Sequence, residues 1–147
     1  MKIKVDDILN AISILDNRFN LDLGSKILLV QDGTLEYALS IISKKKVKFE
    51  VTKQVEYDKY IEREAILIGD YTIIARSIIY KDILPKQIIE DIRKKELGIG
   101  KILKRHKLET FRDIIEVGYD DNIYRVYNII HNSNIAITIK ECIIHSS

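Results

Sequence analysis

Apolar and polar positions along this chain follow two periods, one typical of helices and one typical of strands. Helical spacing over residues 6–19 and 35–44 predicts two helices in the first third of the chain. A third helix is expected to begin at Pro85, and a short helical turn follows the glycines at positions 98 and 100. Residues 21–30 contain Gly24 and Ser25, so no regular element is predicted there.

Much of the remaining sequence alternates residue by residue, which is the pattern of strands with one buried face. Gly69 and Asp70 form a two-residue connection of the kind that joins hairpin strands. Short turn-rich stretches separate the later segments, so consecutive strands are expected to run antiparallel. The predicted strands are residues 47–55, 64–68, 71–80, 111–117, 123–130 and 135–144.

These elements predict an α+β fold with a single antiparallel sheet of about six strands and helices packed on one side. Residues 1–147 are expected to form one domain, because this length suffices for one hydrophobic core and no linker or repeat interrupts it. Isoleucine is abundant, and β-branched side chains favour strands.

Charge and cysteine usage narrow the class of protein. The formal net charge is +2, so nothing requires a nucleic acid or an anionic membrane as partner. Cys142 is the single cysteine, which excludes a disulfide within the chain and fits a reducing cytoplasm. Residues 1–7 lack the apolar core of a signal peptide, and no stretch reaches the roughly 20 apolar residues that span a bilayer. We therefore expect a soluble cytoplasmic protein with no nucleic-acid or membrane partner.

Two charged residues interrupt apolar stripes of predicted strands. Glu141 shares a strand face with isoleucines, and Arg76 shares its face with Ile74 and Ile78. A charged side chain is rarely buried without a partner, so each position needs an explanation. The two residues could form an ion pair with each other or with local partners, or one of the faces could be exposed. Alternatively, both project into a ligand pocket, where Arg76 binds an anion and Glu141 does acid–base or hydrogen-bond work.

Four segments make the chain resemble the chorismate pyruvate-lyase family, including its archaeal and actinobacterial branch, over nearly its full length. The order and spacing of the segments match that family, and the N-terminal helix is the least matched part. The segments are residues 27–34 (ILLVQDGT), 73–77 (IIARS), 97–103 (LGIGKIL) and 139–144 (IKECII).

The resemblance implies an antiparallel sheet against which a ligand is buried beneath flap-like loops. It also implies that Arg76 pairs with a substrate carboxylate and that backbone amides at Thr34 and Ile99 line the same pocket. Glu141 is then expected to meet the ring hydroxyl. Thr34 and Ile99 stand where the better-known bacterial enzymes have other residues, which leaves a related substrate open.

The implied reaction converts chorismate to 4-hydroxybenzoate and pyruvate. Aromatisation drives this elimination strongly downhill, so the resemblance implies no metal and no other cofactor. The protein has to hold the substrate in a reactive conformation and manage one proton. Glu141 could act as a general base or could orient the ring for a pericyclic step.

Other candidate motifs fail on spacing. The Gly98–Lys101 stretch lacks the remaining residues of a phosphate-binding P-loop. His106, His131 and His145 show no metal-ligand spacing with Cys142, so no metal site is predicted.

One alternative function belongs to a different class. Ligand-sensing domains of certain bacterial transcription regulators have the same fold and bind a small anion without catalysis. Such a domain normally follows a DNA-binding winged helix, for which we expect no room in this chain. Arg76 together with Glu141 favours the lyase.

Overall fold

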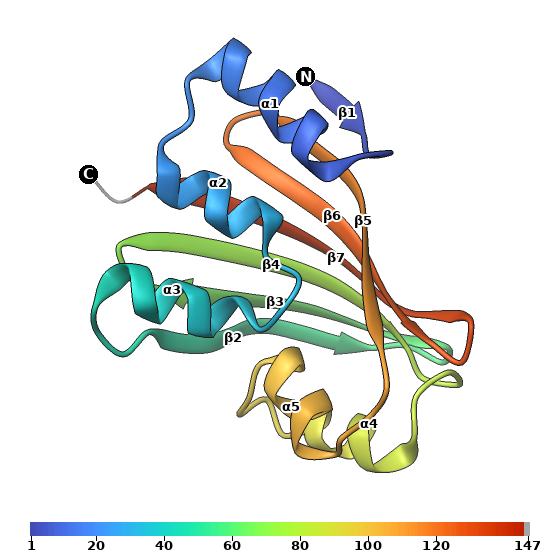
Figure 1. The fold of residues 1–147 in the computed structure, drawn as a ribbon. Helices are drawn as coiled ribbons and strands as arrows, with labels where there is room; N and C mark the ends of the chain where they lie inside the picture. The colour runs from blue at the N-terminus through green and yellow to red at the C-terminus, as the bar shows by residue number, and fades with distance from the viewer. Residues whose placement is uncertain (146–147) are drawn as a thin grey trace.

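An antiparallel sheet forms the centre of the computed structural model, which describes residues 1–145 (Figure 1). Within these residues the sheet has seven strands, in the order β1-β5-β6-β7-β4-β3-β2. All neighbouring strands run antiparallel, which confirms the predicted α+β class and single antiparallel sheet, with seven strands where about six were expected. The strands are β1 (Lys2–Lys4), β2 (Lys48–Glu56), β3 (Tyr60–Ile68), β4 (Tyr71–Tyr80), β5 (Phe111–Tyr119), β6 (Ile123–His131) and β7 (Asn134–His145).

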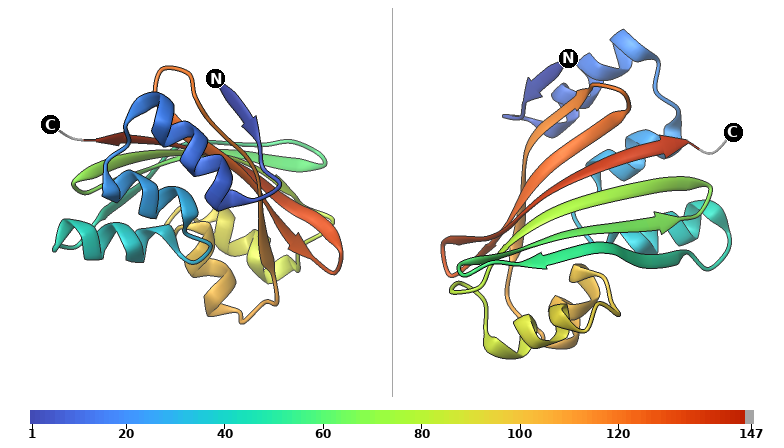
Figure 2. Two further views of the ribbon diagram at one scale, coloured as in Figure 1. Left: turned by 45° about the horizontal axis from the view of Figure 1, so that its top comes forward. Right: turned by 180° about the vertical axis from the view of Figure 1, so that it is seen from behind.

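Five helices within residues 1–145 gather on one side of this sheet, and the view from behind shows the other face uncovered (Figure 2). The first three helices lie towards one end of the covered face, and the last two lie towards the opposite end (Figure 1). No helix in residues 1–145 has both the length and the apolar character needed to cross a membrane. The helices are α1 (Ile8–Phe19), α2 (Leu23–Val30), α3 (Leu35–Ser43), α4 (Lys86–Arg93) and α5 (Ile99–Arg105).

Side-chain caps explain where the first two helices begin. The carboxylate of Asp7 accepts a hydrogen bond from the backbone N–H of Leu9 at 3.0 Å. The carboxylate of Asp22 accepts one from the backbone N–H of Ser25 at 3.3 Å and one from the Ser25 hydroxyl at 2.6 Å. The expectation of no element in residues 21–30 is therefore wrong, because Gly24 and Ser25 lie in the first turn of a capped helix.

Two strands differ from the alternation pattern. β1 is absent from the predicted set and pairs with β5, with Ile3 opposite Val117. β3 begins at Tyr60, before the expected start at Glu64, because its pairing with β4 continues as far as Tyr80. This longer strand includes Arg63, which lies next to the predicted boundary.

Two groups of buried hydrophobic residues hold the helices against the sheet. The first group includes Leu15, Leu28 and Leu39 from α1, α2 and α3. The second group includes Ile88 from α4 and Ile102 from α5. Full burial of one such side chain contributes about 1.5–3 kcal/mol. The covered face is therefore defined by hydrophobic contacts at both of its ends.

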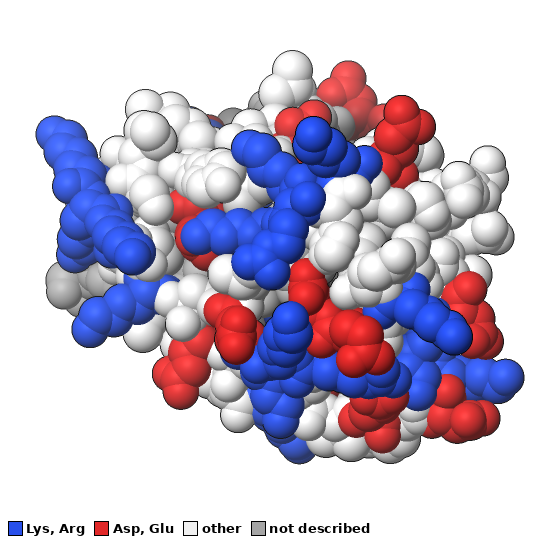
Figure 3. Space-filling model, turned by 90° about the horizontal axis from the view of Figure 1, so that it is seen from below, with Lys and Arg blue, Asp and Glu red and all other residues white. Residues whose placement is uncertain are grey.

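Charged side chains at the α4–α5 end are mixed in sign. Seen from below, basic and acidic side chains lie side by side over this face (Figure 3). Arg93 pairs with Glu56 at 2.8 Å, which joins α4 to β2. Asp91 on α4 pairs with Arg105 at 3.4 Å, which joins α4 to α5. These ion pairs connect neighbouring elements and break up any continuous basic surface.

Candidate functional site

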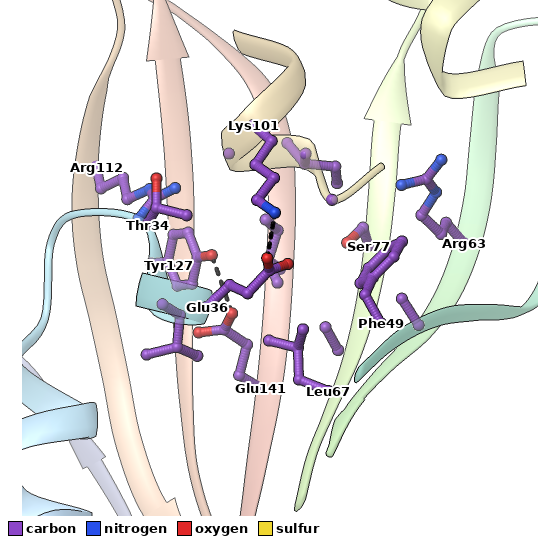
Figure 4. A pocket seen from close by; sticks show the side chains of 17 residues that line it. Thr34, Glu36, Phe49, Arg63, Leu67, Ser77, Lys101, Arg112, Tyr127 and Glu141 are labelled. Atoms are coloured by element: carbon purple, nitrogen blue, oxygen red, sulfur yellow. Dashed lines mark hydrogen bonds and ion pairs between the residues drawn. The ribbon is translucent and has the colours of Figure 1, made fainter. Parts of the chain in front are cut away.

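A cavity lies on the helix-covered face where the two hydrophobic groups meet (Figure 4). Leu35 from the first group lines it, as do Tyr127 and Ile139 from the second. Its volume is about 70 Å³, which is room for several water molecules. Its charged or polar lining side chains are Thr34, Glu36, Arg63, Ser77, Lys101, Arg112, Tyr127 and Glu141.

Strand register brings the sheet residues of this cavity together. Ser77 on β4 lies opposite Arg63 on β3, and Ala75 on β4 lies opposite Glu141 on β7. Glu141 in turn lies opposite Arg125 on β6. Side chains of directly opposed residues project from the same face of a sheet. Residues far apart in the sequence therefore share the face that the helices cover.

Three of the four predicted site residues line this cavity. Thr34 is the N-cap residue of α3, Ile99 is the first residue of α5, and Glu141 lies on β7. Because α3 and α5 both begin at the cavity, Thr34 and Ile99 line the same cavity as the inward-facing carboxylate of β7.

Arg76 does not lie in this cavity, and the prediction that it faces Glu141 is wrong. Its side chain is 59% exposed on the uncovered face, where its Nε donates to Glu64 Oε1 at 3.0 Å. Arg76 lies opposite Lys140 in the strand register. Lys140 directly precedes Glu141 on β7, and adjacent residues of a strand project from opposite faces of the sheet, so Arg76 and Glu141 lie on opposite faces. Alternation identifies the residues that share a face with Arg76, but it does not reveal which face the helices cover.

Glu141 has a buried ion-pair partner in Arg125. The Arg125 Nε donates to Glu141 Oε1 at 2.7 Å, and the two residues are 0% and 5% exposed. The Arg125 guanidinium also donates to the backbone carbonyls of Leu29 and Gln31, which lie at the end of α2. The Tyr127 hydroxyl donates to Glu141 Oε2 at 3.2 Å, and burial is the main cause of the raised pKa of this phenol. The expectation that Glu141 forms an ion pair with a local partner is therefore correct.

Arg63 is the buried cation of the cavity that strand periodicity missed. It is 3% exposed, and its guanidinium donates to the Gln54 side-chain oxygen and to the backbone carbonyls of Ile92 and Leu97, at 2.8 to 2.9 Å. All three acceptors are neutral, and burial lowers the pKa of Arg63 to about 10, so it remains charged at neutral pH. The alternation that contains it begins at Tyr60, and extending the strand four residues would have placed Arg63 beside Ile61 and Ala65 on an apolar stripe.

Arg112 is a second cation at the cavity whose recorded partner is neutral. Its Nη1 donates to the backbone carbonyl of Asp32 at 3.3 Å, and its guanidinium carbon lies 5.4 Å from the centre of the Tyr127 ring. By contrast, Glu36 pairs with Lys101, and Glu141 pairs with Arg125. Within residues 1–145, each acidic side chain of the cavity thus forms an ion pair with a basic side chain. Arg63 and Arg112 form no ion pair there, so their positive charges have no acidic partner.

Comparison with known proteins adds no family to this geometry. No protein-family model matches the chain, and no curated protein matches it. The arrangement itself combines a small cavity, two guanidinium groups and a buried carboxylate with a tyrosine hydroxyl. Such a site can bind an anionic ligand and accept a hydrogen bond from a hydroxyl group on it.

Proposed function

We propose that this protein is a chorismate pyruvate-lyase, with its active site in the cavity between α3, α5 and the sheet. The observation that carries the proposal is Arg63, a buried guanidinium without an acidic partner, in the same cavity as Glu141. A buried charge without a counter-ion is unfavourable, so an anionic ligand at this position is favourable. Chorismate supplies carboxylates and a ring hydroxyl, which are the groups that this cavity can bind.

Arg63 takes the role that the sequence resemblance gave to Arg76. An arginine side chain has five N–H donors, and three neutral acceptors occupy one donor each. The remaining N–H groups can donate to the ring carboxylate of chorismate. The bonds to Ile92 and Leu97 hold the guanidinium in a fixed orientation, which reduces the entropy lost when the substrate binds.

Glu141 and Tyr127 face the other polar group of the substrate. The Glu141 carboxylate, fixed by Arg125 and Tyr127, accepts a hydrogen bond from the ring hydroxyl. In the reaction the bond between the ring carbon and the enolpyruvyl oxygen breaks. The hydrogen on the ring carbon that bears the hydroxyl is lost, and the enolpyruvyl methylene gains a hydrogen as pyruvate forms. The contribution of the protein is to hold the ring and the side chain in the conformation that allows this elimination.

The test compares two arginines on opposite faces of the sheet. Purified protein is mixed with chorismate, and pyruvate and 4-hydroxybenzoate are measured together. The wild type is expected to form both products in equal amounts. Arg63→Gln is expected to lower kcat/KM by about 10- to 100-fold, the effect of losing a hydrogen bond between charged groups. Arg76→Gln is the matched control and is expected to change it by less than about twofold, because its ion pair with Glu64 is exposed.

Three outcomes would contradict the proposal. Absence of both products from the wild type would exclude the lyase, and binding of chorismate without turnover would indicate the sensor class instead. A loss of activity in Arg76→Gln with full activity in Arg63→Gln would move the site to the uncovered face.

A cytoplasmic location belongs to the same proposal, since Cys142 is a free thiol.

A further inference from the structure

The cavity has uncompensated positive charge at two separate places. Arg63 lies on β3 and Arg112 lies on β5, towards opposite sides of the cavity, with Tyr127 and Glu141 between them (Figure 4). The two arginines donate to neutral acceptors, whereas Glu36 and Glu141 are engaged by Lys101 and Arg125. A ligand with a single anionic group can compensate only one of the two guanidinium groups.

Arg112 is held where three segments of the chain approach one another. A Cβ atom added to Gly100 would lie 3.1 Å from Arg112 Nη2 and 3.2 Å from Thr34 Oγ1. The beginning of α5 and the N-cap of α3 therefore pack closely around this guanidinium. Tyr127 flanks Arg112 at 5.4 Å and Arg125 at 4.8 Å, measured from each guanidinium carbon to the ring centre. Arg112 lines the cavity, and its hydrogen bond to the Asp32 carbonyl uses Nη1, so other N–H groups of the guanidinium remain to donate to a ligand.

We infer that the cavity recognises a ligand with two carboxylates, and that Arg112 binds the second one. This inference rests on the proposed function and deepens it, because chorismate carries one carboxylate on its ring and another on its enolpyruvyl side chain. With the ring carboxylate at Arg63 and the ring hydroxyl at Glu141, the side-chain carboxylate faces Arg112. The dianion then compensates both guanidinium groups at once.

The same geometry accounts for discrimination between substrate and products. Cleavage separates the two carboxylates, so that 4-hydroxybenzoate keeps only the carboxylate at Arg63 and pyruvate keeps only the carboxylate at Arg112. Neither product spans both cations. Each product is therefore held by fewer charged contacts than the substrate, which favours release after cleavage.

The size and surroundings of the site favour a small dianion. The lining residues come from both ends of the covered face, and a cavity of about 70 Å³ favours a small ligand over a long polymer. Over the neighbouring α4–α5 face, acidic and basic side chains are mixed (Figure 3). This surface is therefore no continuous basic patch of the kind that binds a polyanion.

The experiment measures binding and turnover separately with Arg112→Gln. The Kd of 4-hydroxybenzoate is obtained by calorimetry, that of chorismate by rapid mixing with the binding signal read within one turnover, and pyruvate formation gives kcat and KM. Wild type is expected to bind chorismate about 10- to 100-fold more tightly than 4-hydroxybenzoate, since one more charge-assisted contact forms. Arg112→Gln is expected to remove this difference by weakening chorismate binding, while the Kd of 4-hydroxybenzoate changes by less than about twofold.

Two further variants make the result specific. Arg112→Lys keeps the positive charge and is expected to restore part of the chorismate affinity. Arg105→Gln removes an arginine of α5 that pairs with Asp91 outside the cavity, and it is expected to leave both Kd values unchanged.

The outcomes for the two proposals can be told apart. Turnover by the wild type with equal chorismate affinity in wild type and Arg112→Gln would overturn the inference and leave the lyase intact. Equal losses of chorismate and 4-hydroxybenzoate binding in Arg112→Gln would also overturn it. Absence of turnover would contradict the lyase, whereas a chorismate preference that disappears in Arg112→Gln would still support recognition of a dicarboxylate.

Discussion

The buried pair Arg125–Glu141 has to be considered both as a structural contact and as part of the proposed site. Both side chains are almost entirely buried, and Arg125 also donates to the backbone at the end of α2. Its Nη2 atom is buried without a hydrogen-bond partner in residues 1–145. A buried pair with an unsatisfied donor contributes little net stability, because desolvation offsets much of the attraction. The proposed catalytic role of Glu141 offers a separate reason for the carboxylate.

A double substitution separates these two roles. Arg125→Met leaves the Glu141 carboxylate buried without its cation and is expected to destabilise the protein by about 3–5 kcal/mol. Combining it with Glu141→Leu removes both charges and is expected to recover most of that loss in stability, while pyruvate formation is lost because the Glu141 carboxylate is absent. Urea unfolding measures the stability. A double variant as unstable as Arg125→Met would show that the pair itself stabilises the fold, and an active double variant would remove Glu141 from the reaction.

Strand alternation correctly identified Glu141 as a residue of the site, but it did not identify Arg63. Glu141 stood out because it interrupts an isoleucine stripe, of which Ile137, Ile139 and Ile143 are buried. Arg76 followed the same pattern on the exposed face, since apolar residues such as Ile78 are common on both faces of this sheet. Arg125 lies between Ile123 and Tyr127 on its face and carried a signal as strong as that of Arg76. The side of the sheet that the helices cover depends on tertiary packing, which alternation does not encode.

At the level of elements, α3 and α5 close the cavity against each other. The Glu36 carboxylate on α3 forms an ion pair with the Lys101 ammonium on α5. Tyr37 on α3 adds a cation–π contact with Lys104, whose ammonium lies 5.0 Å from the ring centre. Ligand pockets for small molecules typically have volumes of roughly 300–1,000 Å³, so a cavity of about 70 Å³ would have to widen to accept chorismate, the proposed substrate. Separation of α3 from α5 is the movement that these contacts oppose.

Breaking the ion pair should therefore speed up ligand exchange. Glu36→Gln is expected to raise the association and dissociation rates of 4-hydroxybenzoate by about two- to fivefold, the effect of one partly exposed ion pair. Stopped-flow fluorescence or NMR line shapes measure these rates. Glu90→Gln breaks an ion pair with Arg93 on α4 away from the cavity and serves as the control. Unchanged rates in Glu36→Gln would mean that the ligand enters without separation of α3 and α5.

The order and class of most elements could be predicted, and the exceptions have local causes. Helical periodicity located α1, α3 and α4, whereas α2 escaped because Gly24 and Ser25 are typical of turns as well as of capped first turns. β1 has three residues, too few for alternation to identify, and its pairing with β5 depends on the tertiary fold. These two elements lie outside the cavity, so their omission did not affect the predicted site. The early start of β3 did affect the predicted site, because the added residues include Arg63.

At the scale of the whole molecule, ion pairs at its surface connect the sheet to the helices at the α4–α5 end. Glu56 at the end of β2 accepts hydrogen bonds from Arg93 on α4 and from Lys81 after β4. These two cations, Arg93 first, lower the pKa of Glu56 from 4.5 to about 2. A carboxyl group whose pKa is lower in the folded state stabilises the fold above its unfolded pKa. That contribution is lost as the pH falls through the folded value.

Glu56→Gln tests this linkage. The variant is expected to be less stable than the wild type at pH 7, because its side chain is neutral at every pH. Between pH 4.5 and pH 2 the wild type should lose the difference, so that the two stability curves converge towards pH 2. Urea unfolding across this range measures the difference, with the exposed Glu50→Gln on the same strand as control. Parallel curves for wild type and Glu56→Gln would contradict the assignment.

We propose that the ligand binds on the helix-covered face, between Arg63 and Glu141. A crystal structure of the protein with 4-hydroxybenzoate would locate the bound ligand. We predict the carboxylate of the ligand at the Arg63 guanidinium and its phenol at Glu141 and Tyr127, with α3 and α5 further apart than in the ligand-free protein. A ligand bound beside Arg76 on the uncovered face, or an unoccupied cavity at saturating ligand, would contradict the account.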